Sequence, residues 1–121
     1  MLFFSDRDTS AKLAALDRSQ AVVEFALDGT ILTANGNFLN TVGYTLAEVQ
    51  GQHHGMFVEP AERESVAYRG FWAALARGEF KAAEFKRVAK GGREIWLQAT
   101  YNPVLDRAGR PCKVLKIATD I

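Results

Sequence analysis

The segment from residue 21 to residue 34 constrains the fold most, because it has the pattern of a complete β-hairpin. Residues 21–27 (AVVEFAL) place an apolar side chain at every second position, as in a strand with one buried face. Asp28-Gly29 follows, and this dipeptide suits a two-residue hairpin turn because both positions accept positive φ. Residues 30–34 (TILTA) form the returning strand. The chain is therefore expected to contain an antiparallel sheet.

Three more strands are predicted in the C-terminal part of the chain. They cover residues 80–89, 93–104 and 112–120, and the turn sequences KGG (90–92) and DRAGR (106–110) separate them. The order along the chain is then helix, two strands, a helical middle and three strands. Because strands and helices do not alternate, this order predicts an α+β fold, a five-stranded antiparallel sheet with short helices and one longer helix on one face.

The helical middle begins with two short helices that have their own start and stop signals. Asn35 offers an N-cap oxygen for a helix that Gly43 ends. Residues 45–48 (TLAE) form a capping box, in which Thr45 and Glu48 each bind the other's backbone N–H. The region therefore forms an irregular layer of short helices.

Two further helices are predicted. Residues 10–18 form a short amphipathic helix with Leu13 and Leu16 on one side. So short a helix is marginal alone in water, so it must pack on the domain or on a second copy of itself. Residues 61–77 form the longer helix, with an apolar stripe made by Ala67, Tyr68, Phe71, Trp72 and Leu75.

Length, charge and cysteine content exclude several classes of protein. A chain of 121 residues forms one domain. Its net charge is +1, from 15 basic and 14 acidic residues without a basic block, so neither nucleic acid nor a membrane surface is an expected partner. Cys112 is the only cysteine, which excludes an internal disulfide and favours a reducing, cytoplasmic location. The sequence contains neither a recognisable nucleophile motif nor a glycine-rich phosphate-binding loop, so an enzyme is not expected.

The chain resembles a PAS domain over nearly its whole length. The motifs that carry this resemblance are VEF (23–25), DGTI (28–31), AN (34–35), Phe38, GY (43–44), EVQG (48–51), KGG (90–92), WL (96–97), NPV (102–104), Asp106, Gly109 and TDI (119–121). Within the family it is most similar to the sensory PAS modules of bacterial methyl-accepting chemotaxis receptors of the aerotaxis or energy-taxis type. That narrower likeness is carried by HHGMFV (53–58), YRGFWAALARG (68–78), and residues 96–104 with residues 113–121.

The resemblance implies a division of the chain and a set of partners. Residues 1–20 would be an N-terminal cap helix and residues 21–121 the PAS sensor domain. Such modules are usually homodimers and neighbour another PAS domain or a helical signalling domain, so the chain is expected to be a fragment of a receptor. A ligand would lie between the inner sheet face and the helices. Asp120, at the end of the last strand, would relay the signal onward.

The resemblance singles out His54 as the candidate cofactor-binding residue. In flavin photoreceptors of the light-oxygen-voltage type a reactive cysteine occupies the corresponding position, so covalent flavin chemistry is not expected here. A neutral imidazole in an apolar pocket suits haem iron, and similar receptors bind haem through a histidine in this short helix or bind FAD. His53 is the second candidate ligand, because in a short irregular segment either of two adjacent side chains could point inward. The expected pocket walls are Met56, Phe57, Leu75, Leu115 and Ile117.

Several functions stay open at this point. The chain could be a cytoplasmic sensory module that binds haem for gas or redox sensing, binds another small ligand, or binds FAD. It could also be a ligand-free dimerisation module, in which residues 10–18 and a sheet face pair two subunits. A buried histidine that only makes hydrogen bonds within a core explains His54 as well as an iron ligand does.

Overall fold

The computed structural model describes residues 6–121, so the first five residues of the predicted cap segment 1–20 lie outside the described part. The elements in chain order are α1 (Asp6–Ser19), β1 (Ala21–Phe25), β2 (Ile31–Ala34), α2 (Gly36–Val42), α3 (Leu46–Val49), the 3₁₀ helix η1 (His54–Phe57), α4 (Pro60–Arg63), α5 (Val66–Ala76), β3 (Lys81–Val88), the 3₁₀ turn η2 (Lys90–Gly92), β4 (Glu94–Leu105) and β5 (Pro111–Asp120).

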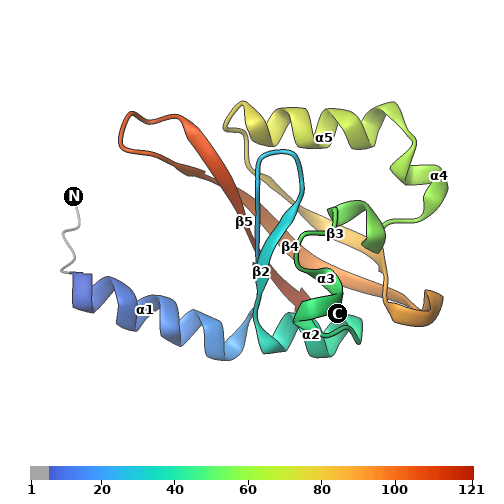
Figure 1. Ribbon diagram of the computed structural model, residues 1–121, viewed down its shortest axis with the longest axis horizontal. Coiled ribbons are helices and arrows are strands. Elements are labelled where there is room, and N and C mark those ends of the chain that lie inside the picture. Colours follow the sequence, from blue (N-terminus) through green and yellow to red (C-terminus); the bar gives the residue numbers. More distant parts are fainter. Residues whose placement is uncertain (1–5) are drawn as a thin grey trace.

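The strands form one antiparallel sheet in the order β2-β1-β5-β4-β3. The last strand of the chain, β5, lies in the middle and joins the two hairpins. Helices α2 to α5 and η1 cover one face, which we call the inner face, whereas α1 leads away from the sheet (Figure 1). The α+β class and the five-stranded antiparallel sheet predicted from the sequence are confirmed.

The helical layer has the predicted caps. The Asn35 side chain accepts a hydrogen bond from the Phe38 N–H at 3.0 Å, and Gly43 ends α2 with a φ of +77°. Thr45 and Glu48 form the predicted capping box at the start of α3. Apolar side chains that are at most 1% exposed fill the space between this layer and the sheet: Val23, Phe25, Ile31, Phe38, Val42, Val49, Phe57, Leu75, Leu97 and Val114.

The β1–β2 turn is longer than the predicted two-residue turn, and its shape positions η1. The Gly29 N–H donates to the Ala26 carbonyl at 3.0 Å, and Gly29 has a φ of +92°. Residues 27–29 therefore form a three-residue hairpin loop whose last residue, Gly29, has the left-handed conformation. The Gly29 carbonyl then accepts the His54 N–H at 2.9 Å. A Cβ on Gly29 would lie 2.6 Å from Nε2 of His53, so glycine is required at this close approach.

The predicted helix over residues 61–77 is two helices. The first, α4, ends at Arg63, and Ser65 begins α5 because its hydroxyl accepts the Tyr68 N–H at 3.1 Å. Serine is a preferred N-cap residue, so it starts a new helix instead of continuing the old one. The new start sets the rotation of α5, which buries Tyr68 and Trp72.

The helix α1 differs from every other long element because none of its residues is buried. It is longer than the predicted helix over residues 10–18, and Leu13 and Leu16 are 55% and 45% exposed. Among residues 6–121, no helix is long and apolar enough to cross a lipid bilayer.

Candidate functional site

His54 lies at the centre of the space between the helices and the sheet, and its side chain is 0% exposed. The backbone of η1 places it there, because this segment is held to the β1–β2 turn. Aromatic rings surround the imidazole, with ring centroids between 5.3 and 6.4 Å away: Phe25, Phe57, Tyr68, Phe71, Trp72 and Tyr101.

Both ring nitrogens of His54 make hydrogen bonds to tyrosine hydroxyls. Nδ1 lies 2.7 Å from Oη of Tyr68 on α5, and Nε2 lies 2.9 Å from Oη of Tyr101 on β4. The imidazole therefore connects the helical layer to the sheet through polar contacts in an otherwise apolar core.

The direction of these hydrogen bonds follows from Arg87 on β3. Its Nη2 donates to the Tyr101 hydroxyl at 3.2 Å, and a guanidinium can only donate. Donation of the Tyr101 proton to His54 Nε2 is the arrangement that also gives this proton an acceptor, because Nε2 is the other polar atom that the Tyr101 hydroxyl meets. A neutral imidazole that accepts at Nε2 carries its proton on Nδ1 and donates it to Tyr68. We call Tyr68, His54, Tyr101 and Arg87, linked in this order, the buried hydrogen-bond chain.

Two buried cations stand at this chain, Arg87 as its last member and Lys116 beside it. Lys116 is 1% exposed and Arg87 is 3% exposed. Lys116 Nζ lies 5.0 Å from the ring centroid of Tyr101 and 5.3 Å from that of Phe38, and it has no hydrogen-bond partner among the described residues. Arg87 meets the half-exposed carboxylate of Glu62 at 3.4 Å. Because a desolvated charge is costly without close compensation, the interior attracts negative charge.

The charges shift the pKa values of the site in different directions. Burial, and then Lys116 and Arg87, hold the pKa of His54 well below the usual 6.5, so the imidazole is neutral at neutral pH. Burial acts to raise the pKa of Tyr101, but the same two cations outweigh it and lower that pKa. Burial raises the pKa of Tyr68 to about 12. Burial also lowers the pKa of Lys116.

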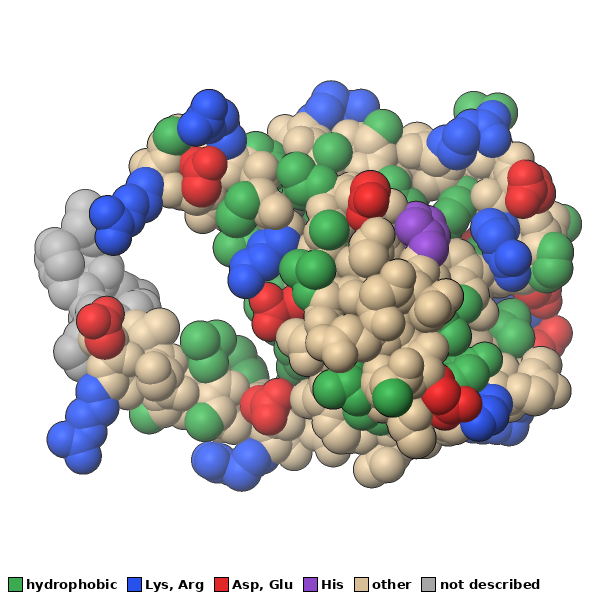
Figure 2. Space-filling view, viewed as in Figure 1, with side chains coloured by type: hydrophobic (Ala, Val, Ile, Leu, Met, Phe, Trp, Pro, Cys, Tyr) green, Lys and Arg blue, Asp and Glu red, His purple; other side chains and the backbone are tan. Residues whose placement is uncertain are grey.

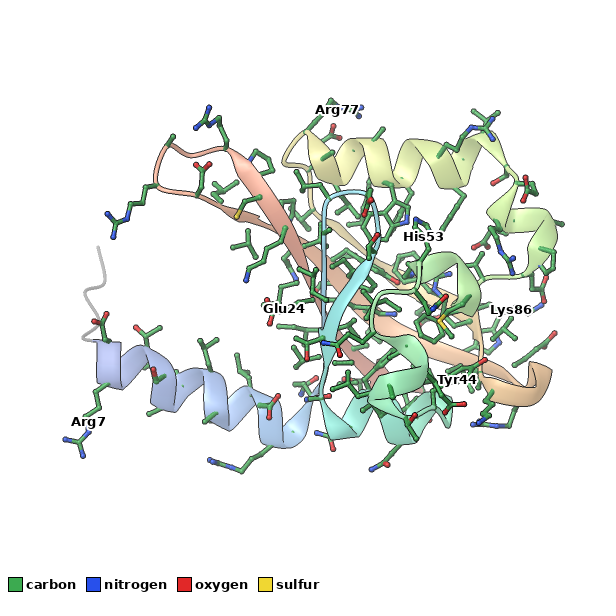
Figure 3. The ribbon with its side chains drawn as sticks, viewed as in Figure 1. Arg7, Glu24, Tyr44, His53, Arg77 and Lys86 are labelled. Atoms are coloured by element: carbon green, nitrogen blue, oxygen red, sulfur yellow. The ribbon has the colours of Figure 1, made fainter. Side chains whose placement is uncertain are left out.

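His53 lies at the surface, between the β1–β2 turn and η1 (Figure 3). Its Nδ1 accepts the Gly55 N–H at 2.9 Å, which caps η1, so Nε2 carries the proton and donates to the Asp28 carbonyl at 2.7 Å. Of the two adjacent histidines, His54 is therefore the one that faces the interior, and His53 holds the turn.

The predicted pocket walls divide between the two faces of the sheet. Phe57 and Leu75 are buried with His54, and Met56 packs against the same core. The expectation that Leu115 and Ile117 also line this space is wrong. Both lie on the outer face of β5, where they line a groove with α1.

Lys116, between those two residues, faces the interior instead, because alternate residues of a strand point to opposite faces. Tyr101 and Arg87 are the other site residues that the sequence patterns do not single out. One signal was available for Tyr101, since it shares the inward alternation of Ile95, Leu97 and Ala99 on β4. Asp120 is exposed at the end of β5, and its role in signal relay stays a prediction.

The contacts of His54 do not fit a haem ligand in this arrangement. A histidine that binds haem iron directs one ring nitrogen at the metal, whereas both nitrogens of His54 meet tyrosine hydroxyls. Aromatic rings also fill the space that a porphyrin would need. Binding of haem iron by His54, with His53 as second candidate, stays a prediction that requires these rings to move, and FAD binding stays a prediction too. Cys112 is exposed at the start of β5, away from this interior.

Comparison with known proteins matches the chain to one protein family. The family model described as the PAS fold matches residues 31–118. Biofilm dispersion protein BdlA of Pseudomonas aeruginosa is 45% identical over 116 residues, which cover 96% of this chain and 28% of that protein. The aerotaxis receptor of Escherichia coli is 33% identical over 93 residues, covering 77% of this chain and 18% of that receptor.

Solved structures share the fold of the chain. The PAS domain of a Colwellia psychrerythraea protein superposes with a TM-score of 0.78 at 23% identity, over 93% of this chain and 96% of that one. A likeness at this identity shows the fold. The chain spans less than a third of the length of both curated relatives.

Proposed function

Because the chain belongs to the PAS family, we propose that it is the cytoplasmic sensory module of a bacterial chemotaxis-type receptor and binds a small molecule between sheet and helices, without enzymatic activity. Its similarity to an aerotaxis receptor and to a biofilm dispersion protein supports a sensory role. The proposal includes partners in the rest of the receptor, either a neighbouring PAS domain or a helical signalling domain.

The buried hydrogen-bond chain is the observation on which ligand binding rests. It links α5 and η1 to β4 and β3 through Tyr68, His54, Tyr101 and Arg87. Buried polar networks are sensitive to the loss of any one partner. A ligand that takes over one of these hydrogen bonds therefore changes how the helices sit on the sheet. The change reaches β5 because Tyr101 is paired directly with Lys116 of that strand, and β5 ends at Asp120.

Recovery of the bound molecule tests this function. The chain is purified from its own bacterium or from a heterologous host, denatured, and the released small molecules are identified by mass spectrometry. Visible absorption spectra are also recorded with haem or FAD added. We expect a small molecule to be bound by the wild type and to be lost or weakened in Tyr101→Phe. Tyr44→Phe is the matched control, because Tyr44 lies at the surface end of the helical layer and outside the buried hydrogen-bond chain (Figure 3).

The same spectra decide the cofactor. A Soret band that is lost in His54→Ala and kept in His53→Ala would support haem ligation, and a yellow protein would support FAD. A wild-type protein that releases no small molecule and takes up neither haem nor FAD would contradict ligand binding.

A second candidate function, a ligand-free dimerisation module, is favoured by the outer face of the sheet. A groove of about 600 Å³ separates α1 from this face. Its apolar lining consists of Leu13, Ala14 and Leu16 of α1 with Val22, Val104, Leu115 and Ile117 of the sheet. Figure 2 shows the open gap between α1 and the rest of the molecule, with hydrophobic side chains on both sides.

We propose a second copy of the chain as the occupant of this groove. A helix of 14 residues without a single buried side chain is marginal alone, and the apolar groove beside it is what such a helix would cover. Two copies related by twofold symmetry can exchange α1 across each other's outer face, so both helices gain a partner at once. Sedimentation velocity tests this, with a dimer expected and a monomer at all concentrations contradicting it.

A further inference from the structure

A small surface groove next to the buried hydrogen-bond chain is not used by the functions described so far. It has a volume of about 210 Å³ and lies between α4, α5 and β3. Its lining consists of Glu62, Ala67, Tyr68, Phe71, Phe85 and Arg87. We call it the Arg87 groove. Tyr68 and Arg87 are the two ends of the buried hydrogen-bond chain, so a molecule in the groove contacts both ends of that chain.

Arg87 lacks a close anionic partner although it is almost completely buried. Nη1 donates to the Lys86 carbonyl at 3.0 Å, Nη2 donates to the Tyr101 hydroxyl, and Nε has no hydrogen-bond partner among the described residues. The Glu62 carboxylate is 3.4 Å from Nη1, longer than the roughly 2.7–2.9 Å of a strong charge-assisted hydrogen bond. Since the Glu62 side chain is 52% exposed, it can leave for solvent at small cost.

The rest of the groove is aromatic. Phe71 packs on Phe85 with ring centroids 6.0 Å apart, and the Arg87 guanidinium lies 4.6 Å from the Phe85 centroid. This stacking holds the guanidinium in place, and a planar guanidinium matches the geometry of a carboxylate. Lys116, whose Nζ lies 5.0 Å from the Tyr101 ring centroid, adds positive charge near the Tyr101 hydroxyl that Arg87 contacts.

We propose that the Arg87 groove binds the carboxylate of a small organic acid with an apolar or aromatic body, and that Glu62 occupies the place of this carboxylate when the acid is absent. The acid would form the close ion pair that Arg87 lacks, while Tyr68, Phe71 and Phe85 contact its apolar part. Displaced Glu62 belongs to α4, which follows η1 in the chain, so binding also loosens the contact between α4 and β3. This inference rests on the proposed sensory function and names its ligand class.

Isothermal titration calorimetry of the whole chain with benzoate as the probe tests the inference. Benzamide serves as the uncharged analogue and inorganic phosphate as an anion without an apolar body. We expect benzoate to bind and the other two to bind at least tenfold more weakly. Glu62→Gln removes the competing carboxylate and should tighten benzoate binding several-fold. Glu64→Gln is the matched control, because Glu64 is exposed on the same turn of chain and does not line the groove.

Loss of the cation gives the opposite change. Arg87→Gln should weaken benzoate binding at least tenfold, and circular dichroism checks that the variant is folded. Glu62→Gln keeps the test decisive even where Arg87→Gln does not fold, because Glu62 is at the surface. Equal binding of benzoate and benzamide, phosphate binding as tight as benzoate, or an unchanged affinity in Glu62→Gln would each overturn the inference.

The inference and the proposed function fail in different ways. A protein that ignores benzoate but releases haem, FAD or another molecule that is not a small organic acid on denaturation would refute the organic-acid site and leave the sensory function standing. A protein that binds none of these molecules would refute both.

Discussion

Over residues 115–117, the two faces of β5 are inverted relative to an ordinary sheet. On the inner face, between Val114 and Ala118, stands the buried amine of Lys116. On the outer face, Leu115 and Ile117 are only partly covered and line the groove beside α1. A strand that served stability alone would have these residue types exchanged.

This arrangement suits the two contacts beyond the fold that we propose, one on each face. A cation in the core lowers stability unless something compensates it, which agrees with the ligand binding that we propose for the interior. Apolar residues on an open surface next to an unburied helix indicate a protein partner. The inner face would then detect the signal, and the outer face would pass it to a second subunit.

The largest expected effect is on the outer face. Ile117→Asp places a charge in the groove that we propose a second copy covers. Loss of an apolar contact at the centre of an interface costs about 2–4 kcal/mol, or roughly 30- to 1,000-fold in dimer affinity. Sedimentation equilibrium measures this change. Thr119→Asp lies on the same face beyond the groove and should leave the affinity within about threefold; an equal loss in both variants would contradict the docking of α1 there.

The next effect is on the inner face, where a substitution should stabilise the protein. Lys116→Met replaces the unpartnered ammonium with an apolar side chain of similar length. We expect the free energy of unfolding to rise by about 1–3 kcal/mol, because a desolvated charge is removed. Urea unfolding measures it. Lys113→Met removes the surface pair with Glu24 and should change stability by no more than about 1 kcal/mol. Destabilisation by Lys116→Met would mean that the cation has a strong partner within the fold.

The elements of this fold were predictable from the sequence because their signals are local. The Asn35 cap, the capping box at Thr45 and the strand alternation of residues 21–25 each act within a few residues. The break before Ser65 had a local signal as well, but the apolar stripe across it favoured one continuous helix.

Which residues of β5 face inward was not predictable in the same way, because apolar residues occur on both faces of this strand. Pairing decides it: Lys116 lies opposite Tyr101 of β4 and opposite Val23 of β1, both of which face inward. The hydrogen-bond partners of His54 were not predictable from the sequence either. Tyr68 and Tyr101 are 14 and 47 residues away in the chain, so no pattern around His54 indicates them.

A smaller effect is the pH dependence that His54 imposes. The folded protein holds the pKa of His54 well below 6.5, so the unfolded chain binds more protons on the acid side of that value. Lowering the pH from about 7 to about 5.5 should therefore decrease the free energy of unfolding, by at most about 1.4 kcal/mol per pH unit. His54→Gln should flatten this slope in urea unfolding experiments. His53→Gln retains His54 and should keep the slope of the free energy of unfolding against pH. A slope that disappears in His53→Gln and persists in His54→Gln would contradict the assignment to His54.

The smallest effect is spectroscopic and tests whether the inner cations act on the buried hydrogen-bond chain. Lys116 and Arg87 lower the pKa of Tyr101, whereas burial raises that of Tyr68 to about 12. In an alkaline titration followed by tyrosinate absorbance, Tyr101→Phe should remove an ionisation that lies below the usual tyrosine range, and Tyr68→Phe should remove one near pH 12. Lys116→Met should move the first ionisation to higher pH, because one of the two cations beside the Tyr101 ring is gone. Lys113→Met changes a lysine on the outer side of the same strand and should leave it in place. An equal shift in both lysine variants would mean that net charge, and not the buried position of Lys116, sets the ionisation of Tyr101.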